Sequence, residues 1–134
     1  MKLISKLFGS IALTACLATA QYTVDQTVLV LARSTTEAFS AYSGLAGYGI
    51  PYQVLVVPQS GVNIPTLNSS ATHGLYAGIV VLSEVSYSYS ATNWSSAISP
   101  AQYNQLYAYQ TAFGVRMVKL DWYRGSIVKV IYIR

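Results

Sequence analysis

The chain has 134 residues and carries eight Lys and Arg residues against four Asp and Glu residues, which gives a formal net charge of +4. This length suits one domain on the usual scale of roughly 100 to 150 residues. The basic residues form no face interleaved with aromatic side chains, so nucleic acid is excluded as the expected partner.

The first twenty residues have the pattern of a secretory signal peptide. Lys2 and Lys6 make a short basic start, residues 7–20 carry no charge, and Ala18-Thr19-Ala20 supplies a small-x-small cleavage site. The apolar run is shorter than the roughly 20 apolar residues that span a bilayer. We therefore expect residues 1–20 to be removed, no membrane span, and a secreted protein that is extracellular or associated with the cell wall.

Cleavage removes Cys16, the only cysteine, so the mature chain has no disulfide. Secreted domains without disulfides depend on a hydrophobic core for their stability. The remaining chain, from residue 21, is therefore expected to fold around a substantial core.

The first part of the mature chain predicts a strand, a helix and a second strand. Residues 27–32 and 52–57 are apolar runs, and Ser34 with Glu37 forms the Ser-x-x-Glu capping box that starts a helix. Glycines from Gly44 onward mark the helix end. Apolar strands joined by a helix indicate a parallel sheet whose strands are buried on both faces.

The later elements extend this pattern. We expect residues 62–74 to be irregular, residues 76–82 to form a strand, and residues 83–98 to form a long polar loop. Ser99 then caps a helix that ends at Gly114, and residues 115–120 read as a fourth strand. Together these elements predict an α/β domain with a small three-layer, mostly parallel, flavodoxin- or Rossmann-like sheet.

The last segment differs in character from the domain before it. Residues 122–134 include the apolar run 127–133, which fits either an edge strand guarded by a lysine or a tail outside the fold. We favour the tail. The predicted organisation is thus a signal peptide over residues 1–20, a single α/β domain over residues 21–121, and a divergent tail over residues 122–134.

No complete catalytic, metal or cofactor site is visible. Arg33 and the hydroxyl residues after it lie where a nucleotide-binding fold holds phosphate, but the glycine-rich fingerprint is absent. His73, the one histidine, is expected to be a surface residue, and one histidine is too few for an ordinary zinc site. Glu84 and Asp121 both follow strands and could approach each other, yet acids there are usually turn residues. We predict no catalytic residue, no metal and no cofactor.

The segment after the third strand carries aromatic side chains among serines and an asparagine. Tyr and Trp rings offer an apolar face with a polar edge, which suits stacking on a sugar ring. The two tyrosines alternate and are expected to point the same way. The candidate carbohydrate-binding residues are Glu84, Tyr87, Tyr89, Asn93 and Trp94.

Two sequons predict N-glycosylation at Asn68 and Asn93, both expected on loops. Asn93 is therefore both a predicted sugar contact and a predicted glycan attachment site.

Long strings of the chain resemble a known family. They are Val28-Leu29-Val30-Leu31-Ala32-Arg33, residues 48–58 and residues 105–118, and they are similar to the N-terminal region of secreted fungal galactosaminogalactan deacetylases. The likeness covers roughly residues 27–121. In that family a carbohydrate-binding module accompanies a metal-dependent deacetylase domain, whose metal-binding Asp and His residues match no position here.

The resemblance implies a non-catalytic, polysaccharide-associated front module, or a truncated form, of a fungal cell-wall and biofilm polysaccharide deacetylase. It also implies that the α/β domain is an incomplete part of a larger protein. The implied partner is a polysaccharide containing galactosamine or N-acetylgalactosamine. Two alternatives stay open: an independent small flavodoxin-like or amidotransferase-like enzyme, and a structural fragment without activity of its own.

Overall fold

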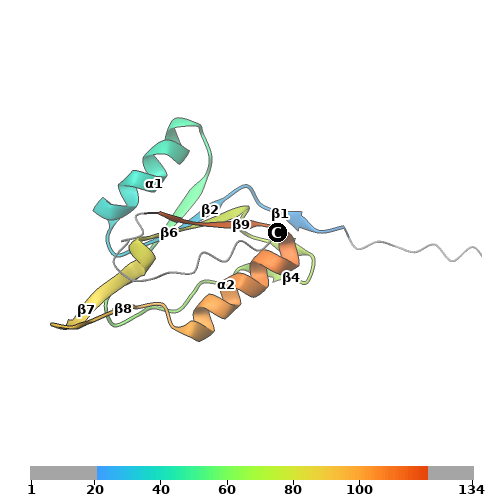
Figure 1. Ribbon diagram of the computed structural model, residues 1–134. Coiled ribbons are helices and arrows are strands. Elements are labelled where there is room, and N and C mark those ends of the chain that lie inside the picture. The colour runs from blue at the N-terminus through green and yellow to red at the C-terminus, as the bar shows by residue number, and fades with distance from the viewer. Residues whose placement is uncertain (1–20, 121–134) are drawn as a thin grey trace, which may run out of the picture.

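The computed structural model describes residues 21–120 and shows a mixed α/β fold (Figure 1). The expected signal peptide and the expected tail lie outside the described residues. The elements in chain order are β1 (Thr23–Val24), β2 (Val28–Ala32), α1 (Thr35–Gly47), β3 (Tyr52–Val56), β4 (Asn68–Ser70), β5 (His73–Gly74), β6 (Gly78–Leu82), the short 3₁₀ turn η1 (Ser83–Val85), β7 (Ser86–Ser90), β8 (Asn93–Ser96), α2 (Pro100–Phe113) and β9 (Arg116–Leu120).

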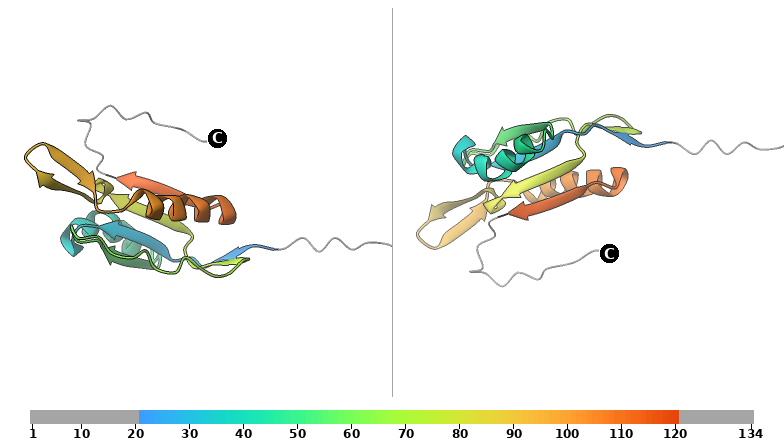
Figure 2. Two further views of the ribbon diagram at one scale, coloured as in Figure 1. Left: turned by 90° about the horizontal axis from the view of Figure 1, so that it is seen from below. Right: turned by 90° about the horizontal axis from the view of Figure 1, so that it is seen from above.

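The main sheet has four parallel strands in the order β3-β2-β6-β9. Successive side chains of a strand point to opposite faces, so Leu29 and Leu31 of β2 pack on one face and Val30 and Ala32 on the other. Helix α1 covers the second of these faces and α2 covers the first (Figures 1 and 2). The prediction of a mixed α/β fold with a mostly parallel sheet is confirmed.

Only the central strands of the main sheet, β2 and β6, are buried on both faces. In β2, four of the five residues are buried, whereas β3 and β9 keep exposed positions because each lies at an edge of the sheet. Val118 and Leu120 of β9 are among these exposed apolar residues. The expectation that both apolar runs of the first unit are buried on both faces is therefore wrong for β3.

The helix starts are set by local side-chain chemistry. Ser99 accepts the Gln102 N–H and Gln102 accepts the Ser99 N–H, so the second capping box is complete. At the first helix, Ser34 accepts the Glu37 N–H, but the Glu37 carboxylate binds the Arg33 guanidinium and backbone N–H instead of the Ser34 N–H. The predicted box is thus half formed, because the stronger charged partner takes the Glu37 carboxylate.

Two segments expected to be irregular contain strands. Residues 62–74 include β4 and β5, which join β1 in a small three-stranded sheet. Residues 83–98, expected to be a loop, include the antiparallel hairpin β7–β8. The alternating serines and tyrosines of residues 86–90 are in fact a period-two strand pattern, although the serines make it more polar than a typical strand. The third strand is also shorter than expected and begins at Gly78.

The two small sheets mark opposite ends of the domain. β1 and β5 precede the central strands β2 and β6, so they lie at the amino ends of the main sheet, while the β7–β8 hairpin projects from the other end (Figure 2). Open α/β sheets bind ligands beyond the carboxyl ends of their strands. The hairpin therefore stands where a ligand site is expected.

Candidate functional site

A strained turn connects the main sheet to the hairpin. Ser83, Glu84 and Val85 all have positive φ angles, of 47°, 53° and 51°. Non-glycine residues rarely adopt this left-handed region, and a β-branched valine almost never does. Such strain persists only where surrounding contacts hold it, and it gathers at functional sites.

The contacts that hold this turn come from β8 and α2. Ser96 Oγ donates to the Glu84 carbonyl at 2.6 Å, and the Tyr103 hydroxyl donates to the same oxygen at 3.3 Å. The Ala97 N–H donates to the Val85 carbonyl at 3.0 Å, and the Val85 side chain is fully buried. The base of the hairpin is therefore fixed to the body of the domain.

The two tyrosines of the hairpin reach the same neighbouring segment. The Tyr87 hydroxyl donates to the Val57 carbonyl at 2.7 Å, and the Tyr89 hydroxyl donates to the Gln59 carbonyl at 2.8 Å. Gln59 in turn donates its amide to the Ser88 carbonyl at 3.0 Å. The expectation that both tyrosines point the same way agrees with these contacts, but both hydroxyls are occupied in tying the hairpin to the turn after β3.

Trp94 points the other way. It pairs directly with Ser88, and directly paired residues of an antiparallel ribbon share a face. Because Ser88 alternates with Tyr87, the Trp94 indole lies on the opposite face from the Tyr87 ring. Trp94 is 66% exposed and Tyr89 is 44% exposed, whereas Tyr87 packs against the core. The expected aromatic cluster is thus divided between the two faces of the hairpin.

Glu84, the acidic residue of the expected site, is engaged with a cation. Its Oε1 lies 3.7 Å from Lys119 Nζ, and that ammonium lies 5.1 Å from the centroid of the Tyr103 ring. Asp121, the expected companion of Glu84, lies outside the described residues.

The Arg33–Glu37 pair stands at the start of α1. The guanidinium donates to both carboxylate oxygens at 2.9 to 3.1 Å, and Arg33 Nη1 lies 3.4 Å from the Ser86 carbonyl of the hairpin. Burial of the Glu37 carboxylate raises its pKa, but the hydrogen bonds from Arg33 and Ser83 together outweigh burial and hold the pKa below its usual value. A hydrogen bond to Glu37 raises the pKa of Arg33. The Glu37 carboxylate therefore occupies the position at the start of α1 where a nucleotide-binding fold would hold phosphate.

Both sequons and the histidine lie in short strands rather than loops. Asn68 opens β4 and Asn93 opens β8, and both are exposed. His73 lies in β5, where its Nε2 is 3.2 Å from Asp25 Oδ1 and its Nδ1 is 2.9 Å from Thr23 Oγ1. These partners lie about fifty residues from His73 in sequence, so the fold alone brings them together.

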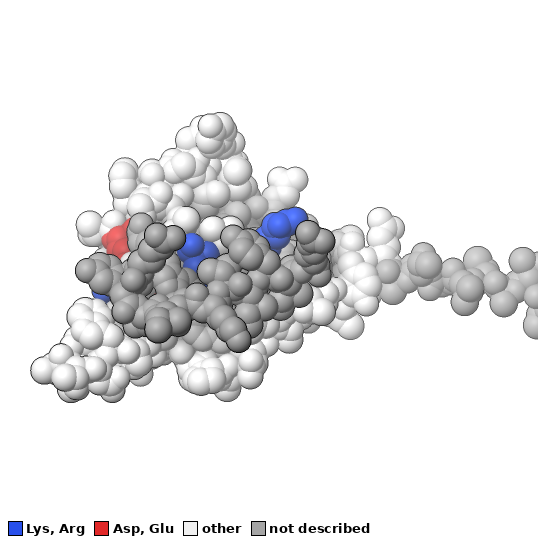
Figure 3. Space-filling view, viewed as in Figure 1, with Lys and Arg blue, Asp and Glu red and all other residues white. Residues whose placement is uncertain are grey.

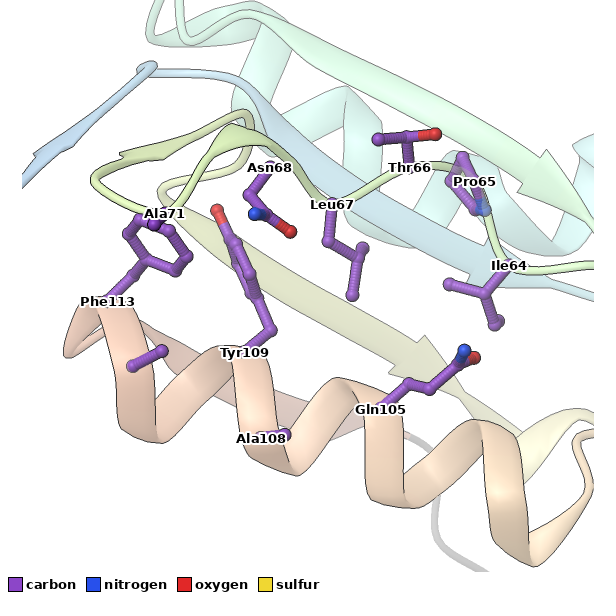
Figure 4. A pocket seen from close by; sticks show the side chains of 11 residues that line it. Ile64, Pro65, Thr66, Leu67, Asn68, Ala71, Gln105, Ala108, Tyr109 and Phe113 are labelled. Carbon is purple, nitrogen blue, oxygen red and sulfur yellow. The ribbon is translucent and has the colours of Figure 1, made fainter.

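A groove that sequence analysis did not predict runs along α2 (Figure 4). Its opposite wall is the connection between β3 and β5, so the two walls are distant in sequence. The groove comprises two adjoining hollows of about 560 and 540 Å³ that share Ile64 and Gln105. Its α2 wall includes the alanines and glutamines Ala101, Gln102, Gln105, Ala108 and Ala112, which resemble ordinary surface residues in the sequence.

Residues 21–120 contain no cluster of three or more His, Cys, Asp or Glu side chains that could hold a metal ion. Within the same range, no helix is long and apolar enough to cross a membrane.

Comparison with known proteins identifies the family. The family model described as Agd3 CBM87 matches residues 24–133, which includes most of the segment expected to be a divergent tail. A crystal structure described as Agd3, a novel carbohydrate deacetylase, is 53% identical to this chain with a TM-score of 0.74. The match covers 78% of this chain and 16% of that chain. A search of curated proteins gives no match. The resemblance inferred from the sequence is confirmed, and the chain belongs to the Agd3 CBM87 family of carbohydrate-binding modules.

Proposed function

We propose that this chain is a secreted, non-catalytic module that binds the polysaccharide on which an associated deacetylase acts. The observation that carries the proposal is the family match over residues 24–133 together with 53% identity to one part of a carbohydrate deacetylase. Because this chain spans 16% of that protein's length, the deacetylation itself is assigned to the rest of a longer protein. The proposed ligand is a polymer containing galactosamine or N-acetylgalactosamine.

The proposed contact surface is the outer part of the β7–β8 hairpin. Trp94 supplies an exposed indole on one face of the hairpin, Tyr89 a half-exposed phenol ring on the other face, and Asn93 an amide next to Trp94 in sequence. An exposed aromatic ring with an amide nearby suits the C–H face and hydroxyl groups of a sugar, and the Trp94 face is the more exposed of the two. Glu84 and Tyr87 belong to the same site as supports, since their side chains hold the base of the hairpin in place.

A glycan on Asn93 and direct sugar contact by Asn93 exclude each other, because glycosylation consumes an amide hydrogen and covers the side chain. We therefore propose that Asn68 is the better glycan acceptor if the hairpin binds polysaccharide.

The strand order and the two covered faces of the main sheet support a flavodoxin-like arrangement reduced to four strands.

Fluorescence of Trp94 tests the hairpin directly. The chain has two tryptophans, so a Trp122→Phe variant leaves Trp94 as the sole indole reporter. Stacking of a sugar ring on this exposed indole should shift its emission to shorter wavelength in a saturable way. Trp94→Ala should weaken binding at least ten-fold, whereas Tyr48→Ala, which removes an exposed aromatic ring at the far end of α1, should leave binding unchanged.

Two results would count against the proposal. Absence of saturable binding to any acetylated or deacetylated hexosamine polymer would refute a polysaccharide-binding role. Full binding by Trp94→Ala would refute the hairpin as the contact surface while leaving the role intact.

A further inference from the structure

The free edge of β3 has an unusual composition for an edge strand. β3 and β9 lie at opposite edges of the main sheet (Figure 2). β9 carries Arg116 and Lys119, and charged side chains of this kind keep an edge strand from pairing with another chain. β3 has the uncharged sequence Tyr-Gln-Val-Leu-Val, and residues 38–83 contain no Asp, Glu, Lys or Arg. The β3 edge therefore lacks the charged protection that β9 has.

The backbone of β3 offers three residues for pairing at this edge. The Val28 N–H donates to the Pro51 carbonyl and the Val57 N–H donates to the Ala32 carbonyl, both at 2.9 Å. The odd-numbered residues of β3 thus point their backbone groups toward β2, and successive residues of a strand alternate in direction. The residues whose N–H and C=O groups point away from β2 are therefore Tyr52, Val54 and Val56. Among residues 21–120, no strand pairs with these outward groups.

The chain limits this outward row at both ends. Before β3, the Ile50 N–H donates to the Leu45 carbonyl of α1 at 2.9 Å. After β3, Pro58 has no N–H to donate. The row is therefore three residues long, and a short strand of matching length can use all of it.

A second copy of β3 matches this row. When two β3 strands pair antiparallel about a two-fold axis through Val54, Tyr52 of each copy faces Val56 of the other and Val54 faces its own counterpart. All of these pairs join outward-pointing residues, and each pair can exchange both of its N–H···O=C bonds. A shift of register by two residues in either direction leaves fewer such pairs. The ends also match, because Ile50 then stands opposite Pro58 and neither has an N–H to offer.

The side chains of the row suit the same pairing. Tyr52 stacks on Tyr42 of α1 with ring centroids 5.1 Å apart, and Val54 packs in the cluster under α1, so the row lies on the α1 face of the sheet. Tyr52 and Val56 are each 38% exposed. Aromatic rings opposite β-branched residues are favourable cross-strand pairs, and no like charges meet in this register.

The flank of α1 beside β3 adds apolar surface. Phe39 is 58% exposed and contacts Tyr42 edge-to-face, with ring centroids 5.4 Å apart. In Figure 3 the surface over the later turns of α1 shows no charged side chain. The two-fold axis is perpendicular to the sheet, so both copies of α1 lie on the same side of the joined sheet with these flanks toward each other. Exposed apolar patches of this kind mark interaction surfaces.

We propose that the free edge of β3, with the adjoining Phe39–Tyr42 flank of α1, is a homodimer surface at which two copies of this chain pair in the register centred on Val54. The two main sheets then form one continuous sheet with the β9 edges outermost. Each copy uses the same patch, so the association closes at two copies. Antiparallel pairing also directs the two β7–β8 hairpins to opposite ends of the joined sheet. This inference goes beyond the proposed function and does not depend on it.

Sedimentation velocity of residues 21–134, from low to high micromolar concentration, tests the association. The chain should form a species of twice the monomer mass. Val56→Lys should weaken dimerisation at least ten-fold, because the ammonium would have to leave water at an uncharged interface. Val118→Lys is the matched control, since it makes the same change at an exposed valine of the opposite edge strand and should leave the dimer unchanged. Circular dichroism checks that both variants keep the fold.

Disulfide trapping tests the register. Residues 21–134 contain no cysteine, so the double variant Tyr52→Cys, Val56→Cys introduces the only thiols. In the proposed register each thiol lies opposite a thiol of the other copy at a Cα separation of about 5.5 Å, which a disulfide can bridge. The oxidised double variant should run as a covalent dimer on a non-reducing gel. Tyr52→Cys alone and Val56→Cys alone should not, because identical positions are offset by four residues, about 13 Å.

Three results would count against this inference. A monomer at every concentration would overturn the homodimer and leave the β3 edge to a strand from another part of a longer protein. Equal weakening by Val56→Lys and Val118→Lys would overturn the β3 edge as the contact. A covalent dimer from either variant with one cysteine, or none from the double variant, would overturn the register centred on Val54.

Discussion

The Tyr109 hydroxyl is expected to be a major stabilising contact between α2 and the rest of the domain. It donates to the Tyr76 carbonyl at 2.7 Å and accepts from the Tyr76 N–H at 2.9 Å, and both contacts are buried. Tyr109→Phe removes the one hydroxyl that makes both hydrogen bonds and keeps the shape of the ring, so the Tyr76 N–H and carbonyl both lose their partner. Each buried backbone group left unpaired costs about 1 to 3 kcal/mol, so we expect a total loss of about 3 kcal/mol.

This loss is large for a domain of this size. Stability of such domains is typically about 5 to 15 kcal/mol, and each kcal/mol lowers Tm by roughly 4 to 8 °C for domains of up to 100 residues. Thermal unfolding followed by circular dichroism should therefore show Tm lowered by about 15 °C. The control is Tyr107→Phe on the same helix, because the Tyr107 ring is exposed and its hydroxyl makes no hydrogen bond to a described residue. A Tm for Tyr109→Phe within 3 °C of that control would refute the reasoning.

Further predictions concern the same helix contact and the charged pair at α1. Gly74→Ala should destabilise the domain, because a Cβ there would stand 2.5 Å from Tyr109 Oη; the loss should be smaller in a Tyr109→Phe background, as a double-mutant cycle would show. Burial raises the pKa of Tyr109 above its usual 10.0, so the folded state holds the phenol proton to a higher pH than the unfolded state does. The stability that this difference contributes is complete below pH 10 and should be lost as the pH rises through the folded pKa. Chemical unfolding of the Tyr109→Phe variant should show a smaller loss of unfolding free energy over that pH range. The pKa of Glu37 lies below its usual 4.5. The Glu37 carboxylate therefore stabilises the fold above pH 4.5, and this stabilisation is lost as the pH falls through the folded pKa. Unfolding curves of Glu37→Gln should show a smaller fall in unfolding free energy over this acid range. Ser99→Ala should cost about 1 kcal/mol through loss of the helix cap, measured by urea unfolding; no loss would show that the Ser99 hydrogen bond is dispensable.

The sequence predicts the main sheet and its helices well because their signals are local. The apolar run of residues 28–32 marks a central strand, and Ser99, Pro100 and Gln102 mark a helix start that the structure reproduces. Each of these features depends on residues within one turn or one strand.

The site is harder to predict because it depends on distant residues and on unusual backbone. Nothing in the residue types of Ser83, Glu84 and Val85 indicates three consecutive positive φ angles, since glycine or asparagine usually occupies such positions. The hairpin register that separates Trp94 from Tyr87 follows from pairing, which a single strand does not reveal.

The α2 groove illustrates the same limit at longer range. Its walls come from segments about forty residues apart, joined by contacts such as the one from Gln102 to Val62. Amides on an exposed helix face look like ordinary surface residues until the opposite wall is known. Their grouping becomes visible only in the folded chain.

The most direct test of the account is titration calorimetry of residues 21–134 with a soluble polymer containing galactosamine and N-acetylgalactosamine. The account predicts saturable heat of binding that an N-acetylated oligosaccharide of the same sugar competes away. A flat titration with a chain shown to be folded by circular dichroism would contradict the assignment of this protein as a polysaccharide-binding module.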